Sequence, residues 1–328
     1  MIKFFAVGVL SFVASSSLLA QEEGSIKEMS TEVDEVVVPI PYGDMDQWLT
    51  RRIKESGIIG GNVRDVYAIA PKGEIEGAIP YVNNESPWAT SNVLAKVAGV
   101  VKTNTSVFPE TRYEGFAARM DTRMESVKVL GLIDITVLAA GSVFLGSVNE
   151  PTKSTSNPQT ILVSGIPFTK RPKAVRFDYK VKLSGENQRV KATGFGSAST
   201  VPGKDLPTAI LLLQKRWEDK KGNVFAKRIG TMVMRYTEDQ EWVSDETYTV
   251  HYGDISGQDF YNESMKIQDE ERFTINSKKK SVPIQEVGWA DEGEEPTHII
   301  LQFASSHGGA YIGSPGNSFW IDNVRLVY

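Results

Sequence analysis

Apolar and polar residues alternate along several short segments of the chain, most regularly over residues 174–183. There an apolar side chain occupies every second position and a charged side chain fills each position between: Val175, Phe177, Tyr179, Val181 and Leu183 against Arg176, Asp178, Lys180 and Lys182. A period of two places the two kinds of side chain on opposite faces of a strand. The segment therefore predicts a strand with one buried face.

Other segments extend this pattern over most of the chain. Residues 208–213 are apolar at both parities, which is typical of a strand buried on both faces, although a short core helix would look similar. The polar residues 219–223 then predict a hairpin that returns through 224–233. Further short runs lie at 247–252, 298–303 and 319–328. The pattern predicts a mainly β protein, a jelly roll or β-sandwich of two antiparallel sheets.

One segment has helical spacing instead. Within residues 44–55, Met45, Trp48, Leu49 and Ile53 recur at intervals of three and four behind Asp44, a residue that can cap a helix. We expect a short N-terminal helix there.

The N-terminal residues are typical of an export signal. Lys3 precedes an apolar stretch at 4–13, and small residues lead to Ala20, after which the chain turns acidic. The apolar stretch is shorter than the roughly 20 residues that cross a bilayer as a helix. We expect a signal peptide over residues 1–20, a flexible acidic linker over 21–40 and a single domain over 41–328.

The composition of the chain limits the cellular compartments and the classes of binding partner that we expect for it. The chain has no cysteine, which excludes the lipid-bearing cysteine of a bacterial lipoprotein, and the later apolar run at 127–145 is interrupted by charges and glycines. We therefore expect an exported protein of the periplasm or cell surface without a transmembrane anchor. The 36 basic and 41 acidic residues give a formal net charge of −5, and the basic residues are scattered along the sequence. Nucleic acid is thus not an expected partner, because phosphate binding needs a concentrated cationic surface.

Candidate ligand-binding residues are aromatic, imidazole or amide groups near turns. Rings of this kind can stack on a sugar while polar neighbours fix its orientation. Each has a structural alternative as a core or loop anchor, and the glycines of loop 305–316 equally serve tight turns. The candidates are Trp88, Asn92, Trp289, His307 and Tyr311.

Motifs for catalysis and metal binding are sparse. The sequence contains no Gly-x-Ser-x-Gly elbow and no His-Glu-x-x-His pair. Acidic residues that could act in glycoside hydrolysis can equally be surface groups, so no catalytic residue is assigned and the question of an enzyme stays open. Asp322 is a candidate ligand of a structural calcium, or else a turn cap or a partner of Arg325; no other cofactor is expected. The acidic candidates are Asp121, Asp178, Asp291 and Glu286.

A set of short landmarks follows one another in a fixed order between residues 88 and 328. They are Trp88 with Ser91 and Asn92, residues 117–122, the glycine-rich 139–146, Gly165-Ile166-Pro167-Phe168 with Arg171-Pro172, and residues 304–316 closing on 320–326. This ordered set resembles the putative carbohydrate metabolism domain (PCMD) family. The long apolar run at 127–140 departs from that family's usual segment.

The resemblance implies a secreted or surface jelly-roll protein of a Gram-negative bacterium that acts in glycan utilisation, with carbohydrate as its partner. It carries no catalytic residue over to this chain. We favour a glycan-binding protein. A glycoside hydrolase or lyase with an unfamiliar carboxylate site, and a structural or adhesive surface protein, are the alternatives.

Overall fold

The computed structural model describes residues 35–97, 99–129, 133–153, 156–194, 196–267 and 272–328, and these form β-strands joined by turns. The helical segments among the described residues are three single 3-10 turns, η1 (Gly57–Ile59), η2 (Pro158–Ile161) and η3 (Glu263–Met265). The predicted signal peptide and most of the predicted linker lie outside the described residues. No helix among the described residues is long and apolar enough to span a membrane.

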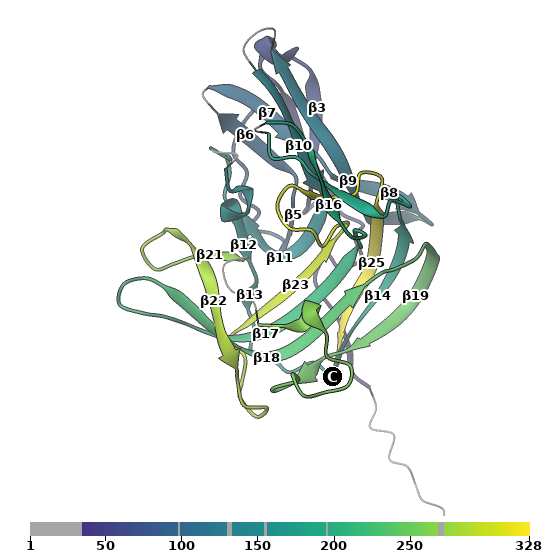
Figure 1. Ribbon diagram of the computed structural model, residues 1–328, viewed down its shortest axis with the longest axis vertical. Coiled ribbons are helices and arrows are strands. Elements are labelled where there is room, and N and C mark those ends of the chain that lie inside the picture. Colours follow the sequence, from purple (N-terminus) through teal and green to yellow (C-terminus); the bar gives the residue numbers. More distant parts are fainter. Residues whose placement is uncertain (1–34, 98, 130–132, 154–155, 195, 268–271) are drawn as a thin grey trace, which may run out of the picture. The chain divides into compact units, whose positions relative to one another are not determined.

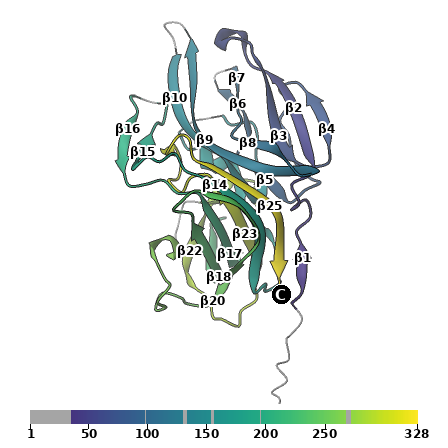
Figure 2. The ribbon, with the colours of Figure 1, turned by 90° about the vertical axis from the view of Figure 1, so that its right-hand side faces the viewer.

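One large sheet has seven strands and contains the strand predicted from the alternating pattern. Its order is β10-β9-β25-β14-β19, with β1 pairing β25 and β8 pairing β9. Figure 2 shows β1 beside the C-terminal strand β25, so the last residues of the predicted linker are part of the sheet. The strands are β1 (Val37–Pro39), β8 (Val107–Arg112), β9 (Gly115–Val129), β10 (Ile133–Ala140), β14 (Ala174–Lys182), β19 (Gln240–Thr249) and β25 (Ser318–Val327).

The second large sheet has ten strands, in the order β13-β23-β17-β18-β22-β21-β12-β11-β5, with β20 pairing β18 and a further pairing between β23 and β11. The predicted hairpin at 208–233 is its centre (Figure 1). The strands are β5 (Trp88–Thr90), β11 (Ser142–Val148), β12 (Leu162–Ser164), β13 (Ile166–Pro167), β17 (Thr208–Glu218), β18 (Val224–Arg235), β20 (His251–Tyr252), β21 (Phe273–Ile275), β22 (Ser281–Trp289) and β23 (His298–Ala304).

Three small sheets complete the fold. Among them, β6 and β7 form a hairpin that contributes to the candidate site. The three sheets are β3-β2-β4, β6-β7 and β16-β15-β24, built from β2 (Trp48–Lys54), β3 (Val63–Ile69), β4 (Gly73–Glu76), β6 (Val93–Val97), β7 (Val100–Asn104), β15 (Gln188–Lys191), β16 (Ser199–Pro202) and β24 (Ile312–Gly313).

The two large sheets pack face to face around the main hydrophobic core, which confirms the predicted β-sandwich. Phe177 and Phe319 of the seven-stranded sheet meet Phe303 of the ten-stranded sheet, and the Phe177 and Phe303 ring centroids lie 4.9 Å apart, edge to face. All three side chains are fully buried. Since each buried aromatic side chain contributes about 1.5–3 kcal/mol, this contact is central to the stability of the sandwich.

The predicted strand with two buried faces is also confirmed. In β17, Ala209, Leu211 and Leu213 face the main core, while Thr208 and Leu212 are buried on the opposite face. On that opposite face Val233, Ile255 and Met265 form a second, smaller cluster, so loop residues cover part of the sheet's outward side.

The predicted N-terminal helix is wrong. Residues 48–54 form β2, which pairs with β3 along its whole length, and Met45 before it has a left-handed backbone (φ 51°). Arg51 is the physical reason that the alternation was hidden: it faces inward between Leu49 and Ile53, where a charge is not expected, and is neutralised by Glu150 at 2.7 Å. Long-range pairing thus overrides the local helical spacing.

Candidate functional site

A cleft of about 570 Å³ opens on the outward face of the ten-stranded sheet. Its floor comes from β17, β18 and β23, and other lining residues come from the β6–β7 hairpin, β10, η2 and loop 306–311. The floor residues are those that alternate with the core positions: Ile210 pairs in register with Val233 of β18 and Gln302 of β23. The alternation that builds the core therefore also presents the cleft floor.

The walls are largely aliphatic, with polar groups placed among them. Val93, Val97 and Val100 line the cleft from the β6–β7 hairpin, and Val137 lines it from β10. Polar lining includes Ser91, Asn104, Gln302, Arg228, Arg235 and Arg272. An apolar pocket with a few convergent polar groups is the usual form of a small-ligand site.

His307 and Tyr311 both line the cleft, beyond the end of β23. His307 Nδ1 lies 3.0 Å from the Leu206 N–H and 3.2 Å from the Leu206 carbonyl oxygen, so contacts with the Leu206 backbone fix the imidazole in place. The structure thus brings together two of the five predicted ligand-binding residues.

A fully buried carboxylate, Asp205, holds this part of the cleft in shape. Its Oδ1 accepts from Ser306 Oγ at 2.8 Å, and its Oδ2 accepts from the Ser314 N–H at 2.8 Å and from Asn317 Nδ2 at 3.3 Å. Loop 305–316 folds around that carboxylate, and a Cβ at Gly313 would lie 3.0 Å from Asp205 Oδ2. Gly313 therefore serves close packing of the loop against Asp205.

Tyr311 has an unusual backbone for its type. Its φ of 63° lies in the left-handed region, which disfavours bulky side chains. Strain of this kind persists where the surroundings fix the residue, and it concentrates at functional sites. The conformation places an aromatic side chain on the cleft lining.

Toward the β22 edge of the floor, a buried ion pair underlies the cleft. Glu286 of β22 pairs with Arg228 of β18, and Gln214 Nε2 donates to Glu286 Oε1 at 2.7 Å. Burial alone would raise the pKa of Glu286, but Arg228 and Gln214 hold it below its usual value. Arg228 Nη1 also donates to the Met265 carbonyl at 2.8 Å, which ties loop 253–266 to the floor.

The other three predicted ligand-binding residues are placed differently. Trp88 is fully buried beside Phe303 and donates Nε1 to the Pro41 carbonyl at 3.0 Å, so neither ring face is available to a sugar. Asn92 is buried and bonded on both sides, with Nδ2 donating to the Val107 carbonyl at 2.8 Å. Both are corrections: these side chains anchor the fold. Within the described part of the chain, Trp289 is half-buried against Arg228 and is not among the lining residues.

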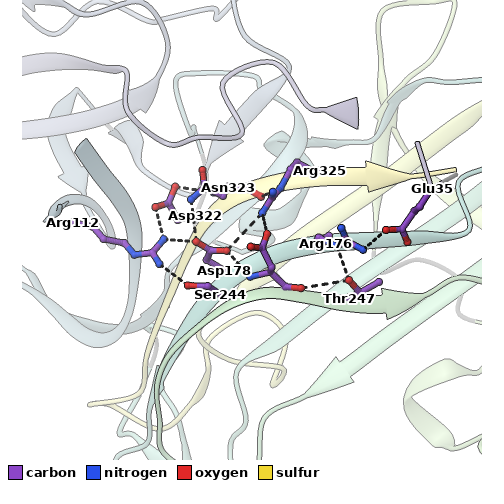
Figure 3. Close-up of polar contacts among 10 residues, drawn as sticks. Glu35, Arg112, Arg176, Asp178, Ser244, Thr247, Asp322, Asn323 and Arg325 are labelled. Carbon is purple, nitrogen blue, oxygen red and sulfur yellow. Dashed lines mark hydrogen bonds and ion pairs between the residues drawn. The ribbon is translucent and has the colours of Figure 1, made fainter. Parts of the chain in front are cut away.

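Asp322, the predicted calcium ligand, is part of a polar cluster on the outward face of the seven-stranded sheet (Figure 3). Arg112 Nη1 donates to Asp322 Oδ2 at 2.6 Å and to Asp178 Oδ2 at 2.7 Å. The Asn323 N–H donates to Asp322 Oδ1 at 2.7 Å. Arg325 instead contacts Asp178 and Asp245. No three acidic or histidine side chains among the described residues converge on a metal site, so the calcium stays a prediction without a ligand set here.

Sequence reasoning missed most of the cleft. Arg228, Arg235, Arg272 and Gln302 carried no motif, because their role depends on which strands become neighbours. Glu286 was a candidate acid, but its position under the floor could not be read from spacing. The sequence carried one signal for the cleft. The outward-facing positions of β17, Thr208, Ile210 and Leu212, are too apolar for a strand face in open solvent, which indicates that other residues cover this face.

Comparison with known proteins places the chain. The family model described as putative carbohydrate metabolism domain matches residues 70–327, which confirms the resemblance seen in the sequence. A putative glycoside hydrolase from Bacteroides thetaiotaomicron VPI-5482 is 19% identical, with 85% of this chain and 70% of that chain covered and a TM-score of 0.44. A second, from Bacteroides vulgatus ATCC 8482, is 13% identical, with 89% and 94% covered and a TM-score of 0.41.

A further solved structure, the mannan-recognising carbohydrate-binding module TmCBM27, is 11% identical, with 74% of this chain and 88% of that chain covered and a TM-score of 0.23. No curated protein matches the chain.

Proposed function

The chain belongs to the putative carbohydrate metabolism domain family, and from this premise we propose that it binds a glycan in the cleft on the outward face of the ten-stranded sheet. The observation that carries the proposal is the joint placement of Tyr311 and His307 on that lining, to which Gln302 and three arginines also contribute. A sugar offers apolar C–H faces and hydroxyl groups, and such a lining supplies both kinds of partner.

Binding is better supported than hydrolysis by the chemistry of the lining. Glycoside hydrolysis by the common mechanisms uses two carboxylates that face the bond to be cleaved. Among the described residues, Glu125 is the carboxylate on the lining, while Asp205 and Glu286 are buried behind it in hydrogen bonds. Binding alone needs no second acid.

The first prediction tests this site. In calorimetric titrations against a panel of neutral oligosaccharides, we expect at least one ligand to bind, and Tyr311→Ala to weaken that binding by about tenfold or more, since it removes a stacking ring. His307→Ala should weaken it less, because it removes one hydrogen-bonding side chain from the lining.

Tyr113→Ala is the matched control. Tyr113 is also a tyrosine with a left-handed backbone (φ 53°), but it lies at the β8–β9 turn, is 85% exposed, and is not on the cleft lining of the described residues. Its replacement should leave the affinity unchanged. Equal loss in both variants, or no binding across the panel, would refute the cleft as the glycan site. Release of new reducing ends, abolished by Glu125→Gln, would instead support hydrolysis.

We also infer that the protein meets its glycan after export to the periplasm or cell surface. The support is the signal-peptide pattern of residues 1–20. Mass spectrometry of the protein from a fractionated cell should find a mature chain that begins at Gln21. A full-length chain confined to the cytoplasm would contradict export.

A further inference from the structure

Two hairpin turns beyond the strand ends of the ten-stranded sheet are joined to each other by side-chain hydrogen bonds. The β17–β18 turn and the β21–β22 turn lie side by side at the left of Figure 1. Asn276 Nδ2 donates to the Gly222 carbonyl at 2.8 Å, and Lys278 Nζ donates to the Lys221 carbonyl at 2.7 Å. A Cβ at Gly222 would lie 2.8 Å from Asn276 Nδ2, so glycine is needed for this close approach.

These contacts use the acidic side chains of the two turns internally. Glu218 Oε2 accepts from the Ser277 N–H at 2.9 Å, and Glu218 Oε1 accepts from Ser277 Oγ at 2.6 Å. Asp219 Oδ1 accepts from the Asn223 N–H, and its Oδ2 accepts from Asn223 Nδ2, both at 2.9 Å. Both carboxylates are therefore committed to shaping the turns.

The lysines of the same turns are all exposed. They outnumber the two carboxylates by three, in a chain whose formal net charge is −5. The fold therefore brings together two short lysine runs that are distant in the sequence. We call this surface the lysine edge: Lys220, Lys221, Lys278, Lys279 and Lys280.

An aromatic pair lies beside the lysine edge. Trp217 of β17 and Phe225 of β18 are registered neighbours whose rings stack at 25° with centroids 5.8 Å apart, and Trp217 is 43% exposed. Strand alternation puts Lys215 and Lys227, the next registered pair, on the same face. An exposed stacked pair flanked by cations is an unusual use of a solvent-facing surface.

We propose that the lysine edge and the Trp217–Phe225 pair form a second binding surface, which holds an acidic polysaccharide. The rings offer a stacking face for a sugar ring, and the lysines attract its carboxylate or sulfate groups. The choice of a sugar polymer rests on the proposed function, because the family links the chain to carbohydrate. The residues of this surface are not among the described lining residues of the cleft.

The test uses the folded, processed chain and polygalacturonate as the probe, with binding measured by affinity electrophoresis and calorimetry. We expect binding at low ionic strength that weakens steeply as salt is added, since screening acts on exposed charges. Replacing Lys220, Lys221, Lys279 and Lys280 by glutamine should weaken it about tenfold or more. Lys278 is kept, because it joins the turns.

Two controls separate this surface from general charge. The same number of lysine-to-glutamine changes at Lys54, Lys72, Lys153 and Lys173, which are exposed elsewhere, should leave the affinity within about twofold. Trp217→Ala should weaken polygalacturonate binding and leave the binding of polyglutamate, an acidic polymer without sugar rings, unchanged.

Several outcomes would overturn the proposal. They are no binding of polygalacturonate at low salt, an equal loss in the control variant, or an oligonucleotide that binds more tightly than polygalacturonate and depends on the same lysines. Tyr311→Ala should not change polygalacturonate binding. If Tyr311→Ala removes polygalacturonate binding while the lysine variant does not, the acidic polymer binds in the cleft. That result would refute the lysine edge as a binding surface and would support the cleft as the glycan site.

Discussion

Replacing Glu286 by alanine is expected to lower the free energy of unfolding by about 3–5 kcal/mol, because it leaves a buried cation without its partner. Arg228 is 2% exposed and Glu286 is 7% exposed, and the guanidinium bonds to both carboxylate oxygens. Gln214 would lose its acceptor on the same carboxylate. The loss should appear in urea titrations, and as a drop in Tm on the order of 10 °C.

The electrostatic surroundings of Glu286 make this loss larger than that of an isolated pair. Burial lowers the pKa of Arg216 to about 9, with Glu286 opposing that shift and Arg272 adding to it. Glu286 is thus a negative group that several guanidinium groups share. Without it, the repulsion among them would favour the unfolded chain.

The matched control is a pair of the same chemistry on the surface. Glu241 pairs with Lys180 at 2.7 Å, and the Glu241 side chain is 86% exposed, so Glu241→Ala should cost less than about 1 kcal/mol. The double variant Arg228→Met with Glu286→Leu should recover part of the loss, since the Arg228 charge is no longer buried without its partner, while Arg216 and Arg272 still lose the carboxylate. If Glu286→Ala costs no more than Glu241→Ala, the ion pair does not stabilise the floor of the cleft.

The sandwich could be predicted because local sequence patterns identify its strands. In β14 every second residue meets the core, and in β17 both parities are apolar, so period and burial agree. The segment 44–55 failed for a related reason. Arg51 faces inward only because Glu150, distant in sequence, supplies its counter-charge, and no local pattern contains that information.

Binding surfaces are harder to predict because they are assembled from strands that are distant in the chain. Tyr311 and His307 could be found, since both lie in one glycine-rich loop. Trp88 was misleading, because an aromatic residue beside a turn signal is compatible with a core position as well as an exposed one. The lysine edge was missed because residues 220–221 and 278–280 become neighbours only through the pairing of β21 and β22 with the central hairpin.

Arg112→Leu is the second change with a large expected effect. Arg112 is 7% exposed, stacks on the Trp242 ring at 3.9 Å, and donates to both Asp178 and Asp322 (Figure 3). Its removal leaves two buried carboxylates near each other without their shared cation. At about pH 8 we expect the free energy of unfolding to fall by about 3–5 kcal/mol.

The pH dependence of this loss follows from the two carboxylates. Burial raises the pKa of Asp322 to about 6, although Arg112 acts in the opposite direction. Burial would also raise the pKa of Asp178, but hydrogen bonds from Asp245, Asn323 and Arg112 hold it below its usual value. The stability due to the protonated form of Asp322 is fully present below its unfolded pKa, and is lost as the pH rises through about 6.

Without Arg112 the pKa of Asp322 should rise further, because a group that lowers it is gone. The variant should then be less destabilised at about pH 5, where Asp322 is protonated, than at about pH 8. Urea titrations of both proteins at the two pH values measure this difference. Adding Asp322→Asn to the Arg112→Leu variant should remove most of the difference between the destabilisation at pH 5 and that at pH 8. A loss of equal size at both pH values would show that the guanidinium does not act by neutralising Asp322, and that it contributes through Asp178 or by packing on Trp242.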